Sequence, residues 1–122
     1  MSDPIRPPGK TTIAPEVLVT IVRLTVLSVP GVSRLATNPS EVERWFSKSI
    51  SEGIKVTVEG NVVYDDIYVI LKPDLNVREV SHTIQTQVTR AISEMVGMEV
   101  GRVNIHVEDI DFAPLSTKAS PK

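Results

Sequence analysis

The sequence contains no cysteine, which excludes both disulfide bonds and thiolate metal sites. Aromatic residues make up only 4 % of the chain, so a hydrophobic core must be built mainly from aliphatic side chains. The formal net charge of −2 gives no electrostatic reason to expect nucleic acid or an acidic membrane surface as a partner. At 122 residues the chain is long enough for one domain with one core.

A long uninterrupted hydrophobic run is also missing. The most apolar stretch extends from Ile13 to Val29, but Pro15, Glu16 and Arg23 interrupt it, which is unsuitable for a transmembrane helix. The first ten residues contain no apolar segment of the kind found in signal peptides. We therefore expect no direct insertion into a membrane.

The N-terminal segment lacks one glycine of a phosphate-binding loop. The stretch PPGKTT ends in Gly-Lys-Thr as such loops do, yet Pro4 occupies the position of the first glycine and has no N–H to offer a phosphate. Three prolines without a periodic pattern instead predict a flexible tail over residues 1–10, and the Pro-, Ser- and Lys-rich residues 113–122 predict another. A single folded domain is expected between residues 11 and 112.

The first predicted helix extends from Pro15 to Val29. Proline and glutamate suit the first helical turn, and Pro30-Gly31 provides the stop. Its apolar residues cover more than one stripe and many are β-branched, so only tertiary burial is expected to stabilise it.

The second predicted helix follows Asn76 and is amphipathic. Asn76 can cap its first turn, Glu79 can complete the reciprocal capping box, and Gly97 suits a left-handed C-cap. Its apolar residues recur three and four positions apart and form one stripe: Val77, Val80, Ile84, Val88, Ala91, Ile92 and Met95.

A β-hairpin is predicted over residues 54–71. Apolar and polar residues alternate from Ile54 to Glu59, and Gly60-Asn61 supplies a turn with positive φ. In the second strand the odd-numbered residues from Val63 to Leu71 share one face, and the even-numbered residues from Tyr64 to Ile70 share the other. Residues 99–112 alternate in the same way and predict a third strand.

The order of elements predicts an α+β two-layer sandwich. A small three-stranded mixed sheet, made of the hairpin and a strand after a crossover helix, is expected to be covered on one face by the two main helices. A short additional helix is predicted over residues 38–50, where Ser40 and Glu43 form a capping box and Trp45 and Phe46 lie on an apolar face. The second face of the sheet is expected to remain open.

Residues capable of catalysis do not form a motif by spacing. Asp65 and Asp66 point to opposite faces of a strand and cannot form a dyad. The two histidines lack partners at zinc-ligand spacing, and Ser33 in GVSRL lacks the second glycine of a nucleophile elbow. We predict a non-enzymatic protein with neither metal nor cofactor, and keep as an alternative a hydrolase built on His106 with Asp66 or a serine.

The open sheet face is the predicted contact surface, and a protein partner is the first interpretation. Two alternatives are ordinary surface tyrosines covered by the tails, and an RNA-binding module that uses the sheet as a stacking platform. The second alternative is weakened because acidic residues outnumber Lys55 and Arg102 on this face. The predicted partner-binding residues are Tyr64, Asp66, Tyr68, Arg102 and His106, together with Trp45 and Phe46.

Four stretches together resemble the alkaline shock protein family, small envelope stress response proteins of Gram-positive bacteria. They are GKTTIAPEVLVTIV, VPGVSRL, GIKVTVEGNVVYDDIYVIL and a C-terminal part containing MVGMEVGRVNIHV, and they extend over about residues 9–111. In that family the first motif opens the domain and leads into the first helix. The resemblance therefore implies a structural role for Gly9-Lys10-Thr11 and not a phosphate cradle.

The resemblance implies a cytoplasmic, non-enzymatic protein without a cofactor. Such a protein self-associates, as a homo-oligomer, or lies beside the membrane through a membrane-anchored partner protein during envelope stress. No catalytic residues carry over. The stretch TNPSEVERWFSKS departs from the commonest family pattern, and its Trp45-Phe46 pair is expected to make a contact particular to this chain.

Overall fold

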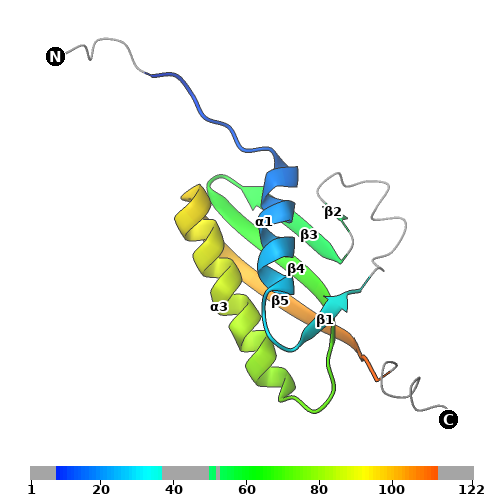
Figure 1. Ribbon diagram of the computed structural model, residues 1–122. Helices are drawn as coiled ribbons and strands as arrows, with labels where there is room; N and C mark the ends of the chain where they lie inside the picture. Colours follow the sequence, from blue (N-terminus) through cyan, green and yellow to red (C-terminus); the bar gives the residue numbers. More distant parts are fainter. Residues whose placement is uncertain (1–7, 37–49, 52, 113–122) are drawn as a thin grey trace.

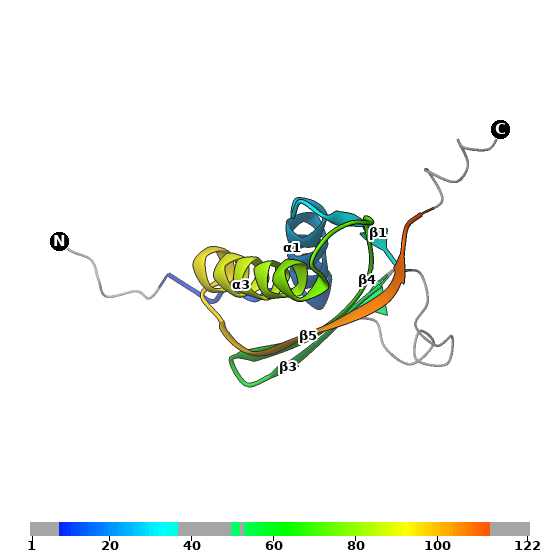
Figure 2. The same ribbon diagram turned by 90° about the horizontal axis from the view of Figure 1, so that it is seen from below.

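The computed structural model describes residues 8–36, 50–51 and 53–112. Within them two helices and a five-stranded sheet follow in the order α1 (Pro15–Leu27), β1 (Val32–Leu35), β2 (Ile50–Ser51), β3 (Ile54–Glu59), β4 (Val62–Leu71), α3 (Val77–Val96) and β5 (Glu99–Ile110). Both helices lie on the same side of the sheet (Figure 1), and the view from below separates the two layers (Figure 2). The predicted α+β sandwich with helices on one face is confirmed.

The sheet contains two strands that the sequence pattern does not predict. β1 has only four residues, and its polar Ser33 and Arg34 interrupt any alternation. β2 has two residues, and it includes Ile50, which the pattern places at the end of a short helix. The remainder of that predicted helix, with Trp45 and Phe46, lies outside the described residues. The sheet is therefore larger than the three predicted strands.

The helix boundaries follow the predicted signals closely. α1 begins at Pro15 and ends at Leu27, two residues before the predicted end. At the start of α3 the Asn76 side chain accepts a hydrogen bond from the Glu79 N–H at 3.0 Å, and Gly97 ends the helix with a φ of 77°. The predicted apolar stripe of α3 is buried at its centre, at Val80, Ile84, Val88 and Ile92, whereas Val77 and Met95 at its ends are exposed.

β4 is the central strand and organises the sheet. β5 pairs with it in parallel along one side, while β3 and β1 pair antiparallel with its first and last parts on the other side. At the junction of β3 and β1, the Tyr68 N–H donates to the Gly53 carbonyl and the Tyr68 carbonyl accepts from the Ala36 N–H, both at 2.8 Å. A Cβ on Gly53 would lie 2.5 Å from the Ala36 oxygen, so the junction requires glycine.

The core lies between β4 and the helices, as the alternation along β4 predicts. The odd-numbered residues from Val63 to Leu71 are buried against α1 and α3, and the even-numbered residues face the opposite side. Asp65 belongs to the buried row and is 1 % exposed. It is the one buried charged residue among those the structure describes.

Candidate functional site

The parallel register of β4 and β5 brings the predicted open-face residues together. Tyr64 lies opposite Arg102, Asp66 opposite Asn104, and Tyr68 opposite His106. No described helix covers this side of the sheet (Figure 2). We call these six residues the open-face cluster. The sequence predicts five of them as partner-binding residues, and it places Asn104 on the same face without predicting a contact for it.

Asp66 is the centre of the open-face cluster. Its Oδ1 atom accepts a hydrogen bond from Asn104 Nδ2 at 3.0 Å and lies 3.1 Å from His106 Nε2. The imidazole ring of His106 in turn stacks on the Tyr68 ring, with a centroid separation of 4.4 Å and an interplanar angle of 14°. The cluster is therefore a connected network and not a set of independent surface side chains.

A second aromatic contact extends the cluster along the strands. The Arg102 guanidinium carbon lies 5.3 Å from the centroid of the Tyr64 ring, within the range of a cation–π interaction. Each tyrosine of β4 thus has a cationic or aromatic partner from β5. These contacts restrict the rotamers of four long side chains before any partner is bound.

The electrostatic surroundings favour the ionised form of Asp66. Partial burial alone would raise its pKa, but the hydrogen bonds from His106 and Asn104 lower it. The charges of His106 and Lys55 act in the same direction, and the net effect is a pKa below the usual value. Asp66 therefore presents a fixed negative charge in the middle of the face at neutral pH.

Beside the cluster, β3 contributes to a shallow hollow of about 340 Å³. Both charge signs meet in it, since the lining includes two basic and two acidic side chains. Such a mixture does not attract a polyanion, and it suits complementary polar contacts with a protein surface. The lining residues are Lys55, Thr57, Glu59, Tyr64, Asp66, Arg102 and Asn104.

Asp65 and Asp66 lie on opposite faces, as predicted, and form no catalytic dyad. Among the described residues neither carboxylate oxygen of Asp65 has a hydrogen-bond partner. Burial, and to a lesser degree the repulsion by Asp66, raises the pKa of Asp65 to about 7. The alternation along the strand places Asp65 in the core row, but sequence reasoning did not predict that it would stand there without a partner.

The hydrolase alternative is only partly matched by the geometry. Asp66 and His106 are in contact, as the base and its orienting acid are in many hydrolases. Ser33 of β1, in contrast, donates its hydroxyl hydrogen at 2.6 Å to Oδ2 of Asp111, which directly follows β5. The nucleophile-elbow interpretation of GVSRL therefore does not connect Ser33 with His106.

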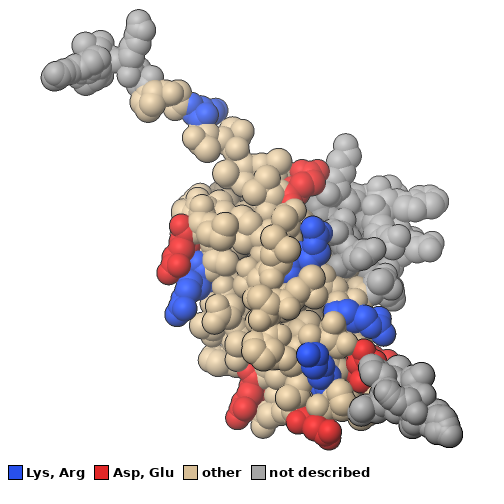
Figure 3. Space-filling view, in the orientation of Figure 1, with Lys and Arg blue, Asp and Glu red and all other residues tan. Residues whose placement is uncertain are grey.

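Sequence reasoning missed a second surface, on the outer side of α1. The abundance of apolar residues predicts burial on more than one side, yet Val17, Leu24 and Leu27 are 45 %, 61 % and 45 % exposed. Figure 3 shows a largely uncharged surface over α1, with charged side chains mainly toward its borders. The second apolar stripe of the helix sequence was the signal that could have predicted this exposed apolar surface. In the described part of the chain no helix has both the length and the apolar character needed to cross a bilayer.

Comparison with known sequences identifies a matching family model and two similar bacterial proteins. Residues 6–112 match the model of the alkaline shock protein 23 family, which is described as having a cell envelope-related function. The chain is 35 % identical over 103 residues to the uncharacterized protein Spy1535 of Streptococcus pyogenes serotype M6, which covers 84 % of this chain and 79 % of that protein. It is 26 % identical over 106 residues to the uncharacterized protein YqhY of Bacillus subtilis strain 168, with 85 % and 78 % covered.

Comparison with solved structures finds weaker similarity. The copper form of MamM CTD covers 77 % of this chain and 84 % of its own, with a TM-score of 0.49 and 15 % identity. The fragment MamM-CTD 215-293 covers 77 % of this chain and 96 % of its own, with a TM-score of 0.48 and 16 % identity.

Proposed function

This chain belongs to the alkaline shock protein family, and we propose that it is a non-catalytic protein-interaction domain with an envelope-related role. It self-associates, and it binds a partner protein through the open-face cluster. It acts in the cytoplasm and reaches the membrane through a membrane-anchored partner. The family match supports the connection with the envelope, and the geometry of the open sheet face supports the mode of action.

The observation that carries this proposal is the preorganised and accessible state of the open-face cluster. The side chains of His106 and Asp66 are 40 % and 33 % exposed, although both are fixed by contacts with their neighbours. Side chains that are already ordered lose little rotamer entropy on binding, which favours affinity. Tyrosine and arginine are also the residue types that most often dominate binding energy at protein interfaces.

A protein partner fits the face better than RNA does. RNA-binding sheets offer the free faces of aromatic rings for base stacking. Here His106 already covers one face of Tyr68, and Arg102 lies over the ring of Tyr64. The fixed charge of Asp66 would also repel a phosphate backbone.

Substitution of Tyr68 by alanine tests the role of the cluster. The full chain, Tyr68→Ala and the exposed-loop control Lys72→Ala are immobilised, and proteins captured from a lysate of the source bacterium are quantified by mass spectrometry. We expect at least one protein to be captured by the wild type and Lys72→Ala and to be depleted at least about tenfold by Tyr68→Ala, as for a hot-spot residue. Equal capture by all three chains would contradict the assignment of the site.

Two further measurements separate the components of the proposal. Size-exclusion chromatography with light scattering tests self-association, and a strict monomer at high concentration would refute that part. Retention of RNA that falls steeply between low and moderate ionic strength would favour the RNA-binding alternative. We expect no RNA retention even at low salt.

A further inference from the structure

β5 presents a free edge along one side of the sheet. It pairs with β4, and no other described strand pairs with it. Its outward-facing main-chain groups can be identified from β4. Both the N–H and the carbonyl of Tyr68 are bonded toward Gly53 and Ala36, on the side away from β5. Because main-chain groups alternate sides along a strand, those of Ile67 and Val69 are directed toward β5.

The same alternation fixes the orientation of β5. Ile67 lies opposite Ile105, and in a parallel pair a residue bonds to the neighbours before and after its opposite residue. The main-chain groups of Asn104 and His106 therefore serve β4, and those of Val103, Ile105 and Val107 are directed outward. An independent contact agrees, because Gln85 Nε2 of α3 donates to the Val103 carbonyl at 3.0 Å. A carbonyl oxygen has two lone pairs, so this one can still accept a second hydrogen bond.

We propose that a second copy of this chain pairs with this edge, with the two β5 strands antiparallel and a two-fold axis at Ile105. The inference rests on the proposed self-association and names the surface that produces it. In this register the outward N–H of Ile105 donates to the Ile105 carbonyl of the second copy, and the outward carbonyl accepts from the Ile105 N–H of that copy. Val103 lies opposite Val107 of the second copy, and Arg102 lies opposite its Glu108.

Charge complementarity selects this register over its neighbours. Centred on Ile105, the pairing places Arg102 opposite an acidic residue twice, once on each side of the axis. Centred on Asn104, Arg102 would lie opposite a histidine, and centred on His106, Glu108 would lie opposite an asparagine. Pairing at Ile105 would also cover the half-buried side chains of Ile105 and Val107, which pack at the border of the core.

Two irregularities in β5 limit the pairing to a short stretch. Val100 and Arg102 are opposite consecutive residues of β4, and so are Val107 and Asp109, so that Gly101 and Glu108 are extra residues of bulges. Bulges bend an edge strand and end its ladder of main-chain hydrogen bonds, so Arg102 and Glu108 of the second copy would meet at the two ends of the paired stretch. The regular stretch between them is suited to a closed two-fold dimer and not to an open fibre.

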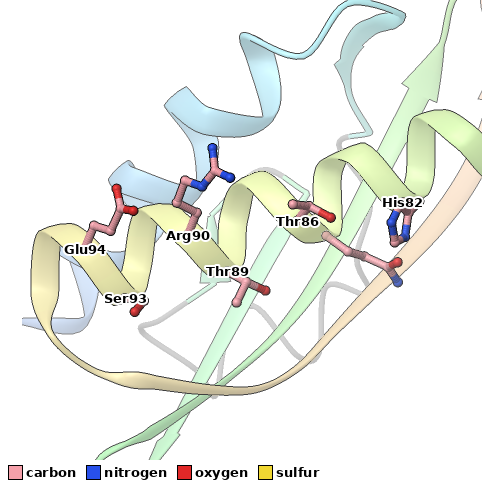
Figure 4. Close-up of a pocket in the computed structure, with 7 residues that line it drawn as sticks. His82, Thr86, Thr89, Arg90, Ser93 and Glu94 are labelled. Atoms are coloured by element: carbon pink, nitrogen blue, oxygen red, sulfur yellow. The ribbon is translucent and has the colours of Figure 1, made fainter.

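The neighbouring side of α3 is compatible with the approach of a second copy. Figure 4 shows Thr89, Ser93 and His82 directed toward the β5 side, whereas Arg90 and Glu94 point away from it. These residues line an open hollow on the helix surface of about 450 Å³. The short polar side chains would let two α3 helices approach across the axis. In such a dimer the two open-face clusters would form one continuous platform.

A single introduced cysteine tests the axis directly, because the chain has no cysteine of its own. Ile105→Cys, purified as the full chain and mildly oxidised, should form a disulfide-linked dimer, since directly opposed residues are within disulfide distance. Thr57→Cys on β3, exposed on the open face and away from the proposed axis, is the control and should remain mainly without a cross-link. Equal cross-linking of the two variants, or none of Ile105→Cys, would overturn the proposed pairing.

Charge reversal provides a second readout at two exposed positions. Arg102→Glu and Glu108→Arg should each raise the dimer dissociation constant about 5- to 30-fold, because two symmetry-related pairs become repulsive. The double variant should return to within about threefold of the wild type. Failure of the double variant to recover would refute the register. If light scattering shows a wild-type oligomer that neither test affects, self-association stands and β5 pairing is wrong; a monomeric wild type refutes both.

Discussion

Replacement of Asp65 by asparagine should stabilise the protein at alkaline pH. Asp65 lies in the row of β4 that packs against the helices, between Val63 and Ile67, which are both fully buried. Neither of its oxygens has a hydrogen-bond partner in the described part of the chain. Asparagine has nearly the same shape but no charge, so the substitution removes the ionisation and changes the packing little.

The magnitude follows from the pKa of Asp65, which burial raises from 3.8 to about 7. A pKa that is higher in the folded state means that the folded chain holds its proton more tightly than the unfolded chain. Stability from this group is thus complete below pH ~4, falls as the pH rises, and levels off above pH ~7. A shift of about three units corresponds to a loss on the order of 4 kcal/mol, at about 1.4 kcal/mol per unit.

Urea denaturation at a series of pH values between 4 and 8 measures this effect. The wild type should lose stability across that range, whereas Asp65→Asn should show a much flatter profile and a higher midpoint at pH 8. Asp66→Asn is the matched control on the opposite face. The lowered pKa of Asp66 contributes stability above the unfolded-state pKa that is lost only as the pH falls. This variant should therefore keep the decline of stability between pH 5 and 8, slightly reduced because Asp66 no longer repels the charge of Asp65. A wild-type profile without a decline, or an Asp65→Asn chain that is less stable at pH 8, would refute the reasoning.

Three other predictions, which use four substitutions, test the fold. Gly53→Ala should lower the free energy of unfolding by more than about 2 kcal/mol, because its Cβ would meet the Ala36 oxygen at 2.5 Å. Gly60→Ala, with a similar positive φ and open space around it, should lower it by about 1 kcal/mol. Comparable urea midpoints for the two variants would argue against the β1–β3 junction. Asn76→Ala should lower stability by about 1 kcal/mol through loss of the cap on α3, as measured by thermal unfolding, and an unchanged midpoint would show that the cap contributes nothing. Leu24→Gln on the exposed side of α1 should change stability by less than about 0.5 kcal/mol, and a large loss would mean that this side is covered.

The elements that could be predicted from the sequence have strong local signals. α3 combines a capping asparagine, a terminal glycine and one apolar stripe, and the hairpin alternates on both sides of Gly60-Asn61. β1 lacks such a signal, because two of its four residues are polar and its position depends on contacts with Gly53 and Tyr68. Those contacts join segments that are distant in the sequence, and local patterns do not report them.

The membership of the open-face cluster could also be predicted, but its internal contacts could not. Strand alternation is enough to place Tyr68 and His106 on the same face. Whether their rings meet depends on the register of two parallel strands, which are separated by a 20-residue helix and adjusted by two bulges. A shift of the β4–β5 register by one residue pair would have removed the contact between Asp66 and His106, and with it the hydrogen-bond network of the cluster.

The buried position of Asp65 and the open-face cluster have the same cause. Sliding β4 by one residue would take Asp65 out of the core but would bring Asp66 and both tyrosines into it. The present phase buries four aliphatic side chains of β4 in the odd-numbered row, Val63, Ile67, Val69 and Leu71. Their burial contributes roughly 6–12 kcal/mol, at about 1.5–3 kcal/mol each, which exceeds the ~4 kcal/mol cost of an ionised Asp65. The aliphatic row therefore determines the phase of the strand, and that phase also directs the cluster toward the open side of the sheet.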